Sequence, residues 1–190
     1  AVAPPDRDRI VQTHRLTEAY RHPGGMQAAG RYLAVAFEES QGEELHEDGG
    51  GPERHGLVGG VRLAPGGMQV VWEVVTEHRG VPCVAFGRLE GGRFLLVIAG
   101  QGTQSLSFHL SRTRDPARPE WQRIATWEAG DVETDFLVQP SERTVWRRYQ
   151  TIQLVTVCRD GQLYLAGLGG PRLPGLGERD WVDLYRLDLT

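Results

Sequence analysis

Short stretches of alternating apolar and polar residues run along most of this chain, and glycine-rich breaks separate them. In Ser105–Leu110 every second residue is apolar, with serines and His109 between, so the two kinds of side chain would lie on opposite faces of a strand. A period of two is typical of half-buried β-strands. The same interpretation predicts extended segments at Met26–Ala29, Arg31–Glu39, Leu57–Leu63, Met68–Val75, Val81–Leu89, Arg93–Ala99, Trp121–Trp127 and Gln162–Gly167.

Turn-forming residues lie between consecutive segments and predict hairpins. Gly30-Arg31, Pro65-Gly66-Gly67 and Glu90-Gly91-Gly92 each separate two extended segments. Asp160-Gly161 lies between two apolar runs and is the strongest of these signals, because both residues tolerate positive φ.

The last segment, Trp181–Leu189, admits two interpretations. Leu184 and Leu187 are three residues apart, which suits a helix over Asp180–Leu189. Trp, Val and Tyr favour pleated, half-buried positions, so we expect a strand.

The segments recur in one order, which indicates internal repeats. Gln27–Phe37, Val84–Ile98 and Gln153–Ala166 each contain a strand, a Gly-containing turn and an apolar strand, and a further strand follows each of them. The first two repeats add a fourth strand, whereas the last stops one strand short. Successive antiparallel four-stranded units of this kind are the sequence signature of β-propeller blades.

This order predicts a single all-β domain over residues 1–190. We expect a propeller-like arrangement of about three four-stranded antiparallel blades. A β-sandwich built from similar hairpins is the alternative. The repeats would span residues 21–76, 79–128 and 146–190.

Several of these stretches resemble a known group of proteins. HPGGMQAAGRYLAVAFE, FLLVIAG and YQTIQLVTVCRDGQLYLAG, together with DWVDLYRLDL, look like bacterial propeller-like repeat proteins, which are often secreted and have no assigned activity. The resemblance covers most of Arg21–Leu189 and rests on strand and turn patterns. It implies a fold, and it brings no catalytic residues with it.

Charge and composition narrow the range of partners. The net charge of −4, with both signs mixed along the chain, argues against a nucleic-acid partner. No apolar run is long enough to span a membrane. The first residues, Ala1–Pro5, suit either a mature secreted protein or a trimmed chain. We expect Cys83 and Cys158 to be buried free thiols rather than a disulfide.

No motif in the sequence specifies a catalytic, metal or cofactor site. Gly100-x-Gly102 follows an apolar run, as in a dinucleotide fingerprint, but the residues after it alternate with period two and open no helix. Ser107 and His109 would share a strand face, which we interpret as a solvated polar face because no third orienting group is evident. The histidines lack metal-ligand spacing, and the acidic loop Glu38–Glu53 lacks the pattern of a calcium loop.

The tryptophans are expected to pack between sheets, with a sugar-binding surface as the alternative. They are Trp72, Trp121, Trp127, Trp146 and Trp181.

The positions of polar residues within the repeats predict a ligand site. In a propeller the first strand of each blade lines the central channel, so polar residues at the entries of these strands would converge at one mouth. We therefore predict a non-enzymatic binding module that recognises a protein or carbohydrate at that mouth, with a hydrolase or lyase as the alternative. The candidate ligand-binding residues are His22, Gln27, Arg79, Arg147, Tyr149 and Gln150.

The unequal repeats also suggest a homodimer. Three blades are fewer than the roughly four to eight that close a ring. Ile10–Tyr20 precedes the first repeat and reads as a spare strand. Two chains that exchange this segment would complete each other's last blade and cover the open edges. A monomer with edges capped by loops such as Glu128–Glu142, or a piece of a longer chain, is the alternative.

Overall fold

The computed structural model describes a part of the chain in which every long element is a β-strand. This part consists of Thr13, Leu16 and residues 22–38, 55–77, 80–100, 103–128, 149–169, 172–173, 177–178 and 181–189. Its strands are β1 (His22–Ala29), β2 (Tyr32–Glu38), β3 (Leu57–Ala64), β4 (Gly67–Val75), β5 (Val84–Arg88), β6 (Phe94–Ala99), β7 (Ser105–Ser111), β8 (Trp121–Glu128), β9 (Tyr149–Thr156), β10 (Leu163–Gly169), β11 (Arg172–Leu173), β12 (Gly177–Glu178) and β13 (Trp181–Leu187).

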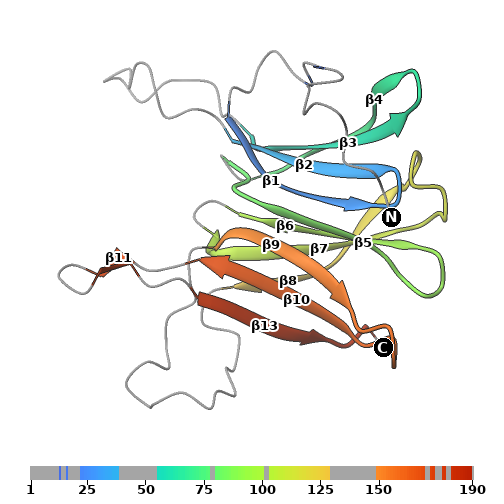
Figure 1. Cartoon of the computed structure of the whole chain (residues 1–190). Helices are drawn as coiled ribbons and strands as arrows, with labels where there is room; N and C mark the ends of the chain where they lie inside the picture. Colours follow the sequence, from blue (N-terminus) through green and yellow to red (C-terminus); the bar gives the residue numbers. More distant parts are fainter. Residues whose placement is uncertain are drawn as a thin grey trace, which may run out of the picture.

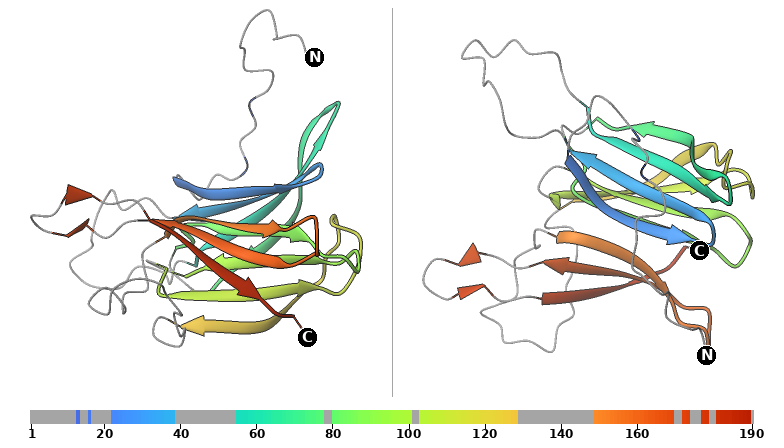
Figure 2. Two further views of the ribbon diagram at one scale, coloured as in Figure 1. Left: turned by 60° about the horizontal axis from the view of Figure 1, so that its bottom comes forward. Right: turned by 45° about the horizontal axis from the view of Figure 1, so that its top comes forward.

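Eleven of these strands form three antiparallel sheets (Figure 1). Sheet A contains β1, β2, β3 and β4 in that order, and sheet B contains β5, β6, β7 and β8. Sheet C contains β9, β10 and β13, so it has one strand fewer. The short hairpin of β11 and β12 projects away from the three sheets (Figure 2). The all-β prediction is confirmed.

The glycine turns of two predicted hairpins and the predicted last strand are present. Gly30 and Gly161 adopt φ values of 62° and 71° in the turns of the β1–β2 and β9–β10 hairpins, where a residue without Cβ avoids strain. Residues 181–187 form a strand paired with β10, so the strand interpretation of the last segment is correct and the helical alternative is wrong.

The first strands of the three sheets lie together at the centre, where one side chain joins them. Gln27 of β1 accepts hydrogen bonds at Oε1 from the backbone N–H groups of Phe86 in β5 (2.9 Å) and Leu154 in β9 (2.8 Å). Its Nε2 donates to the Leu154 carbonyl oxygen at 2.8 Å. This amide therefore connects all three sheets and occupies the space between their first strands.

Close backbone approach reinforces this junction. The N–H of Gly25 donates to the carbonyl oxygen of Pro82, just before β5, at 2.8 Å. A Cβ on Gly24 would lie 2.4 Å from the same oxygen, so the backbone of β1 can reach β5 only because residue 24 lacks a side chain.

Sheet B is the middle layer and is apolar on both faces. Every residue of β6 is buried. Leu96 and Ile98 pack toward sheet A, whereas Leu95 and Val97 pack toward sheet C. Because side chains alternate between the faces of a strand, one continuous apolar run supplies both inter-sheet cores.

Tryptophans fill the margins of the two cores. Trp72 and Trp121 meet edge-to-face with ring centroids 5.3 Å apart between sheets A and B. Trp127 packs against Phe108 at 4.5 Å, beside the core shared by sheets B and C. The packing role is confirmed for these three rings. Trp146 and the side chain of Trp181 lie outside the described residues.

The two cysteines are not joined by a disulfide. Cys83 is buried, with Sγ 3.7 Å from the Tyr149 carbonyl oxygen. Cys158 is exposed because it lies in the turn between β9 and β10, so its predicted burial is wrong.

Most of the proposed closing strand, Ile10–Tyr20, lies outside the described residues. Leu16 is an exception, and it packs on the face of sheet A that points away from sheet B, against Val35, Phe37 and Leu57. The acidic loop Glu38–Glu53 and Glu128–Glu142 also lie almost entirely outside them.

Candidate functional site

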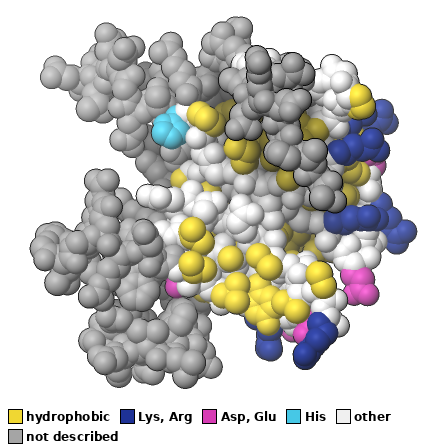
Figure 3. All heavy atoms as spheres, viewed as in Figure 1, with side chains coloured by type: hydrophobic (Ala, Val, Ile, Leu, Met, Phe, Trp, Pro, Cys, Tyr) yellow, Lys and Arg dark blue, Asp and Glu magenta, His cyan; other side chains and the backbone are white. Residues whose placement is uncertain are grey.

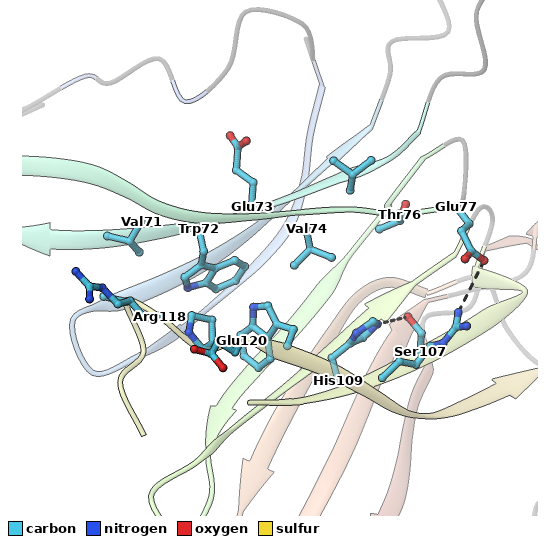
Figure 4. A pocket seen from close by; sticks show the side chains of 15 residues that line it. Val71, Trp72, Glu73, Val74, Thr76, Glu77, Ser107, His109, Arg118 and Glu120 are labelled. Atoms are coloured by element: carbon cyan, nitrogen blue, oxygen red, sulfur yellow. Dashed lines mark hydrogen bonds and ion pairs between the residues drawn. The ribbon is translucent and has the colours of Figure 1, made fainter. Parts of the chain in front are cut away.

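A groove of about 670 Å³ lies between the outer strand of sheet A and one face of sheet B (Figure 4). Residues 71–77, in and just after β4, form one wall. Alternate residues of β7 and β8, together with residues 117–120 of the connecting loop, form the other. This volume lies within the usual range for a ligand-binding cleft.

Strand β4 presents its open backbone edge to the groove. Within the described sheets β4 pairs with β3 alone. The Thr76 N–H donates to the Gly56 carbonyl oxygen at 2.9 Å. Thr76 follows β4 and Gly56 precedes β3, so these two residues form a hydrogen-bonded pair that extends the β3–β4 ladder. Bonding direction alternates along an antiparallel strand, so Glu73 and Val75 direct their N–H and C=O groups away from β3. In the part of the chain that the structure describes, the groove thus contains a strand edge with no neighbouring strand.

The side chains of β4 divide between the two faces of sheet A. Trp72 and Val74 point toward sheet B, whereas Glu73 points away from it (Figure 4). Trp72 also donates from Nε1 to the carbonyl oxygen of Pro116 in the β7–β8 loop at 2.9 Å. This bond ties the end wall of the groove to β4.

The β7–β8 loop is held in shape by its own hydrogen bonds. Thr113 Oγ1 donates to the Arg118 carbonyl oxygen at 2.6 Å, and the Ala117 N–H donates to Asp115 Oδ1 at 2.9 Å. Side-chain bonds of this kind are typical of Asx and ST turns. The groove wall is therefore preorganised rather than dependent on a ligand.

Ser107 and His109 lie side by side in the groove. Ser107 Oγ and His109 Nε2 are 3.0 Å apart. The pKa of His109 is lowered to about 4, first because burial disfavours the imidazolium and second because the Arg123 guanidinium is near. Ser107 is buried, so the interpretation of this face as solvated is wrong. The physical reason is that this face of sheet B is turned toward sheet A.

Charged groups at the groove rim have a minor role in stability. Arg123 Nη1 and Glu77 Oε2 are 3.8 Å apart, and both side chains are mostly exposed. Exposed pairs of this kind typically contribute about 0 to 1 kcal/mol. They set the local charge of the rim rather than the fold.

The structure describes four of the six sequence-predicted site residues. Gln27 uses its amide to join the first strands, as described above. His22 and Gln150 are exposed near the starts of β1 and β9. Arg79 and Arg147 lie outside the described residues. The predicted ligand site at the mouth stays a prediction.

Tyr149, the remaining predicted site residue, is buried in a polar cluster of sheet C. Its hydroxyl donates to Asp183 Oδ2 at 2.8 Å and also contacts the Tyr185 hydroxyl. Burial raises the pKa of Tyr149, and the bonds to Tyr185 and Asp183 raise it further. Tyr149 therefore remains a protonated hydrogen-bond donor. A Cβ on Gly167 would lie 2.6 Å from its ring, so that glycine makes the space.

Sequence reasoning missed the groove. Trp72, Arg118 and Arg123 come from three elements whose proximity depends on how sheet A packs on sheet B. Among the residues that line it, the sequence singled out Ser107 and His109 as a polar strand face, and Trp72 and Trp121 as packing or sugar-binding rings.

Comparisons with known proteins do not assign the chain to a family. No protein-family model matches it, and a search of curated proteins finds no match. Within the described ranges, no group of three or more His, Cys, Asp or Glu side chains is placed to hold a metal ion. The same part of the chain contains no helix long and apolar enough to cross a membrane.

His109 is expected to make the fold sensitive to acid. Its pKa is about 4 in the folded protein against 6.5 ordinarily, so between these values the unfolded chain binds a proton that the folded chain does not. Stability is therefore lost as the pH falls below 6.5. After allowance for solvent screening, we expect a loss of about 1 to 2 kcal/mol at about pH 5.

Urea denaturation of the parent and of His109→Gln, at neutral pH and at about pH 5, measures this loss. The variant should lose less stability on acidification than the parent. His22→Gln, at an exposed histidine of β1, should behave as the parent does. Equal acid sensitivity in the parent and in His109→Gln would contradict the assignment.

Proposed function

We propose that this chain is a non-enzymatic interaction module that binds an extended segment of a partner protein as an added strand on β4. The observation that carries the proposal is the open edge of β4 inside a preformed groove. An incoming strand would bond to the backbone of Glu73 and Val75. One face of that strand would lie against sheet B. Strand addition of this kind draws affinity from main-chain bonds and specificity from pockets for alternate side chains.

The aromatic residues of the groove favour a peptide over a carbohydrate. Sugar stacking needs a free ring face, but Trp72 packs against both Trp121 and Phe86. Its N–H is also bonded to the Pro116 carbonyl oxygen. The open backbone edge therefore carries the recognition in this proposal, and the indoles form an apolar wall.

We also propose that the three sheets are propeller-like blades, with the groove between the outer strands of two neighbours. The proposal is supported by the second strands of sheets A and B, which have the same orientation toward the next sheet. The Leu63 N–H donates to the Arg31 carbonyl oxygen, so Arg31 is bonded to β3. Because bonding direction alternates along β2, the backbone of Ala34 is bonded to β1. The side chain of Ala34 faces sheet B. The Ala99 N–H donates to the Cys83 carbonyl oxygen, and Ala99 faces sheet C. The residues bonded to the first strand thus face the next sheet in both cases.

Proline substitution at the edge tests the binding proposal. Val75→Pro removes one edge N–H from the groove and spares the β3–β4 ladder, because that N–H points away from β3. We expect short peptides selected from a random displayed library to bind the parent. We expect them to lose at least tenfold in affinity for Val75→Pro, as measured by calorimetry. Selected peptides should show alternating apolar residues.

Thr126→Pro is the matched control. Thr126 lies opposite Ser107 on the open edge of β8, and it does not line the groove. Binding should survive this change. A library that yields no binder, or binders that ignore Val75→Pro, would overturn the proposal.

The Ser107–His109 pair favours a second candidate, a hydrolase that uses Ser107 as nucleophile. Their 3.0 Å separation meets the distance needed between a nucleophile and its base. Against it, the lowered pKa makes His109 a weak base, and Ser107 is buried. A fluorophosphonate probe that labels the parent but not Ser107→Ala would establish the hydrolase. We expect no Ser107-dependent labelling.

A further inference from the structure

Among the described strands, sheet C has an open edge at β13. Sheets A and B each contain four strands, whereas sheet C contains three, and β13 pairs only with β10 in the part of the chain described. Open edges carry unsatisfied backbone groups and are ready templates for another strand.

Hydrogen bonding between β9 and β10 fixes which residues of β13 face this edge. The Val157 N–H donates to the Gln162 carbonyl oxygen at 2.9 Å, which sets the alternation in β10. The backbone groups of Leu163, Leu165 and Gly167 are therefore bonded to β13. It follows that Val182, Leu184 and Arg186 direct their N–H and C=O groups to the open edge.

The same edge carries the most exposed apolar side chains of sheet C. Val182 is 67% exposed and Leu184 is 56% exposed. Leu168 of β10 continues this apolar face inward from the edge and is also exposed. Figure 3 shows hydrophobic side chains gathered over the region where Figure 1 draws β10 and β13.

We propose that two copies of this chain associate by pairing β13 with β13 in antiparallel fashion about a two-fold axis at Leu184. Leu184 is the middle residue of Trp181–Leu187, so this register pairs the strand along its whole length. Leu184 then lies opposite its own copy, and Val182 lies opposite Arg186. Each of these pairs exchanges two backbone hydrogen bonds.

The strand is complementary to itself in this register. Within Trp181–Leu187 the outer face opposes no two charges of like sign, because Arg186 meets Val182. On the inner face Asp183 lies opposite Tyr185 rather than another carboxylate. A two-fold interface needs this kind of self-complementarity. The rival occupant from the same chain, Ile10–Tyr20, is disfavoured because its Leu16 packs on sheet A.

The register predicts specific disulfides in a Cys158→Ala background. Opposed bonded residues have Cα atoms about 5.5 Å apart, which suits a disulfide. Leu184→Cys should give a covalent dimer on mild oxidation, and Val182→Cys alone should not. A mixture of Val182→Cys and Arg186→Cys proteins should give a heterodimer. Cross-linking by Val182→Cys alone, with none by Leu184→Cys, would overturn the register.

Charge at the axis provides the second test. Leu184→Arg would oppose two guanidinium groups, and we expect at least a tenfold rise in the dimer dissociation constant by light scattering or sedimentation. Leu168→Arg makes the same change on the same face, one strand in from the edge, and should leave the dimer intact. A parent protein that stays monomeric would refute the proposal. Equal dissociation by both variants would indicate face-to-face packing and overturn edge pairing.

Discussion

Replacing Gln27 with leucine is expected to lower the free energy of unfolding by about 3 to 5 kcal/mol. The substitution keeps the side-chain size but removes the three hydrogen bonds that connect β1 to Phe86 and Leu154. It leaves two N–H groups and one carbonyl without partners at a junction of three sheets. Each unsatisfied group of this kind costs about 1 to 3 kcal/mol. Urea denaturation followed by tryptophan fluorescence measures the loss.

Gln153→Leu is the matched control. Gln153 also bridges two first strands, but its exposed Nε2 makes a single bond to the Met26 carbonyl oxygen at 3.2 Å. We expect this change to cost less than about 1 kcal/mol. Equal losses in the two variants, or a Gln27→Leu protein as stable as the parent, would show that the amide of Gln27 does not hold the sheets together.

Gly24→Ala is expected to lower the free energy of unfolding by about 2 to 4 kcal/mol. The added Cβ would lie 2.4 Å from the Pro82 carbonyl oxygen and 2.9 Å from that of Val81. Both obstacles are backbone atoms, so β1 must move away from β5. That movement would also stretch the neighbouring bond from Gly25 to Pro82. Thermal unfolding should show a clear fall in Tm.

Gly66→Ala provides the comparison for this substitution. A Cβ there meets nothing within 4 Å, because Gly66 lies in the exposed turn between β3 and β4. We expect a change within about 0.5 kcal/mol. A loss at Gly66 as large as that at Gly24 would indicate a general effect of glycine replacement and not the contact with Pro82.

Local patterns in the sequence account for most of the strands and hairpins. The strand at Ser105–Leu110 and the hairpin at Asp160-Gly161 depend on residues close together in the chain, and both are present. Of the two turn residues, Gly161 has positive φ and Asp160 does not. Each of the three sheets takes its strands from one stretch of the chain, and the interpretation of these stretches as repeats stays a prediction. Burial of β6 on both faces follows from its unbroken apolar run.

The candidate site was less predictable because it depends on contacts between distant segments. Gln27 stood out as a polar residue at the start of a repeat, but its partners belong to two other sheets. The sequence predicts a solvated face for Ser107 and His109, because no pattern in the neighbouring residues indicates that sheet A covers this face of β7. The bond from Trp72 to Pro116 spans 44 residues, and no pattern in either segment signals it.

Two open strand edges with different surroundings suggest two kinds of association. The edge of β4 lies in a groove walled by sheet B, which admits one extended segment. The edge of β13 is accompanied by the exposed side chains of Val182 and Leu184, which suits a copy of the same sheet. Val75→Pro should therefore affect peptide binding alone, and Leu184→Arg should affect the dimer alone.

Amide hydrogen exchange, with and without a selected peptide, tests the binding proposal most directly. The peptide should slow exchange at Glu73 and Val75, whose N–H groups face the groove. Trp72 and Val74 should change little, because they are already bonded to β3. Protection confined to the strand starts near His22 and Gln150, with none at Glu73 and Val75, would contradict strand addition on β4 and place the ligand at the mouth.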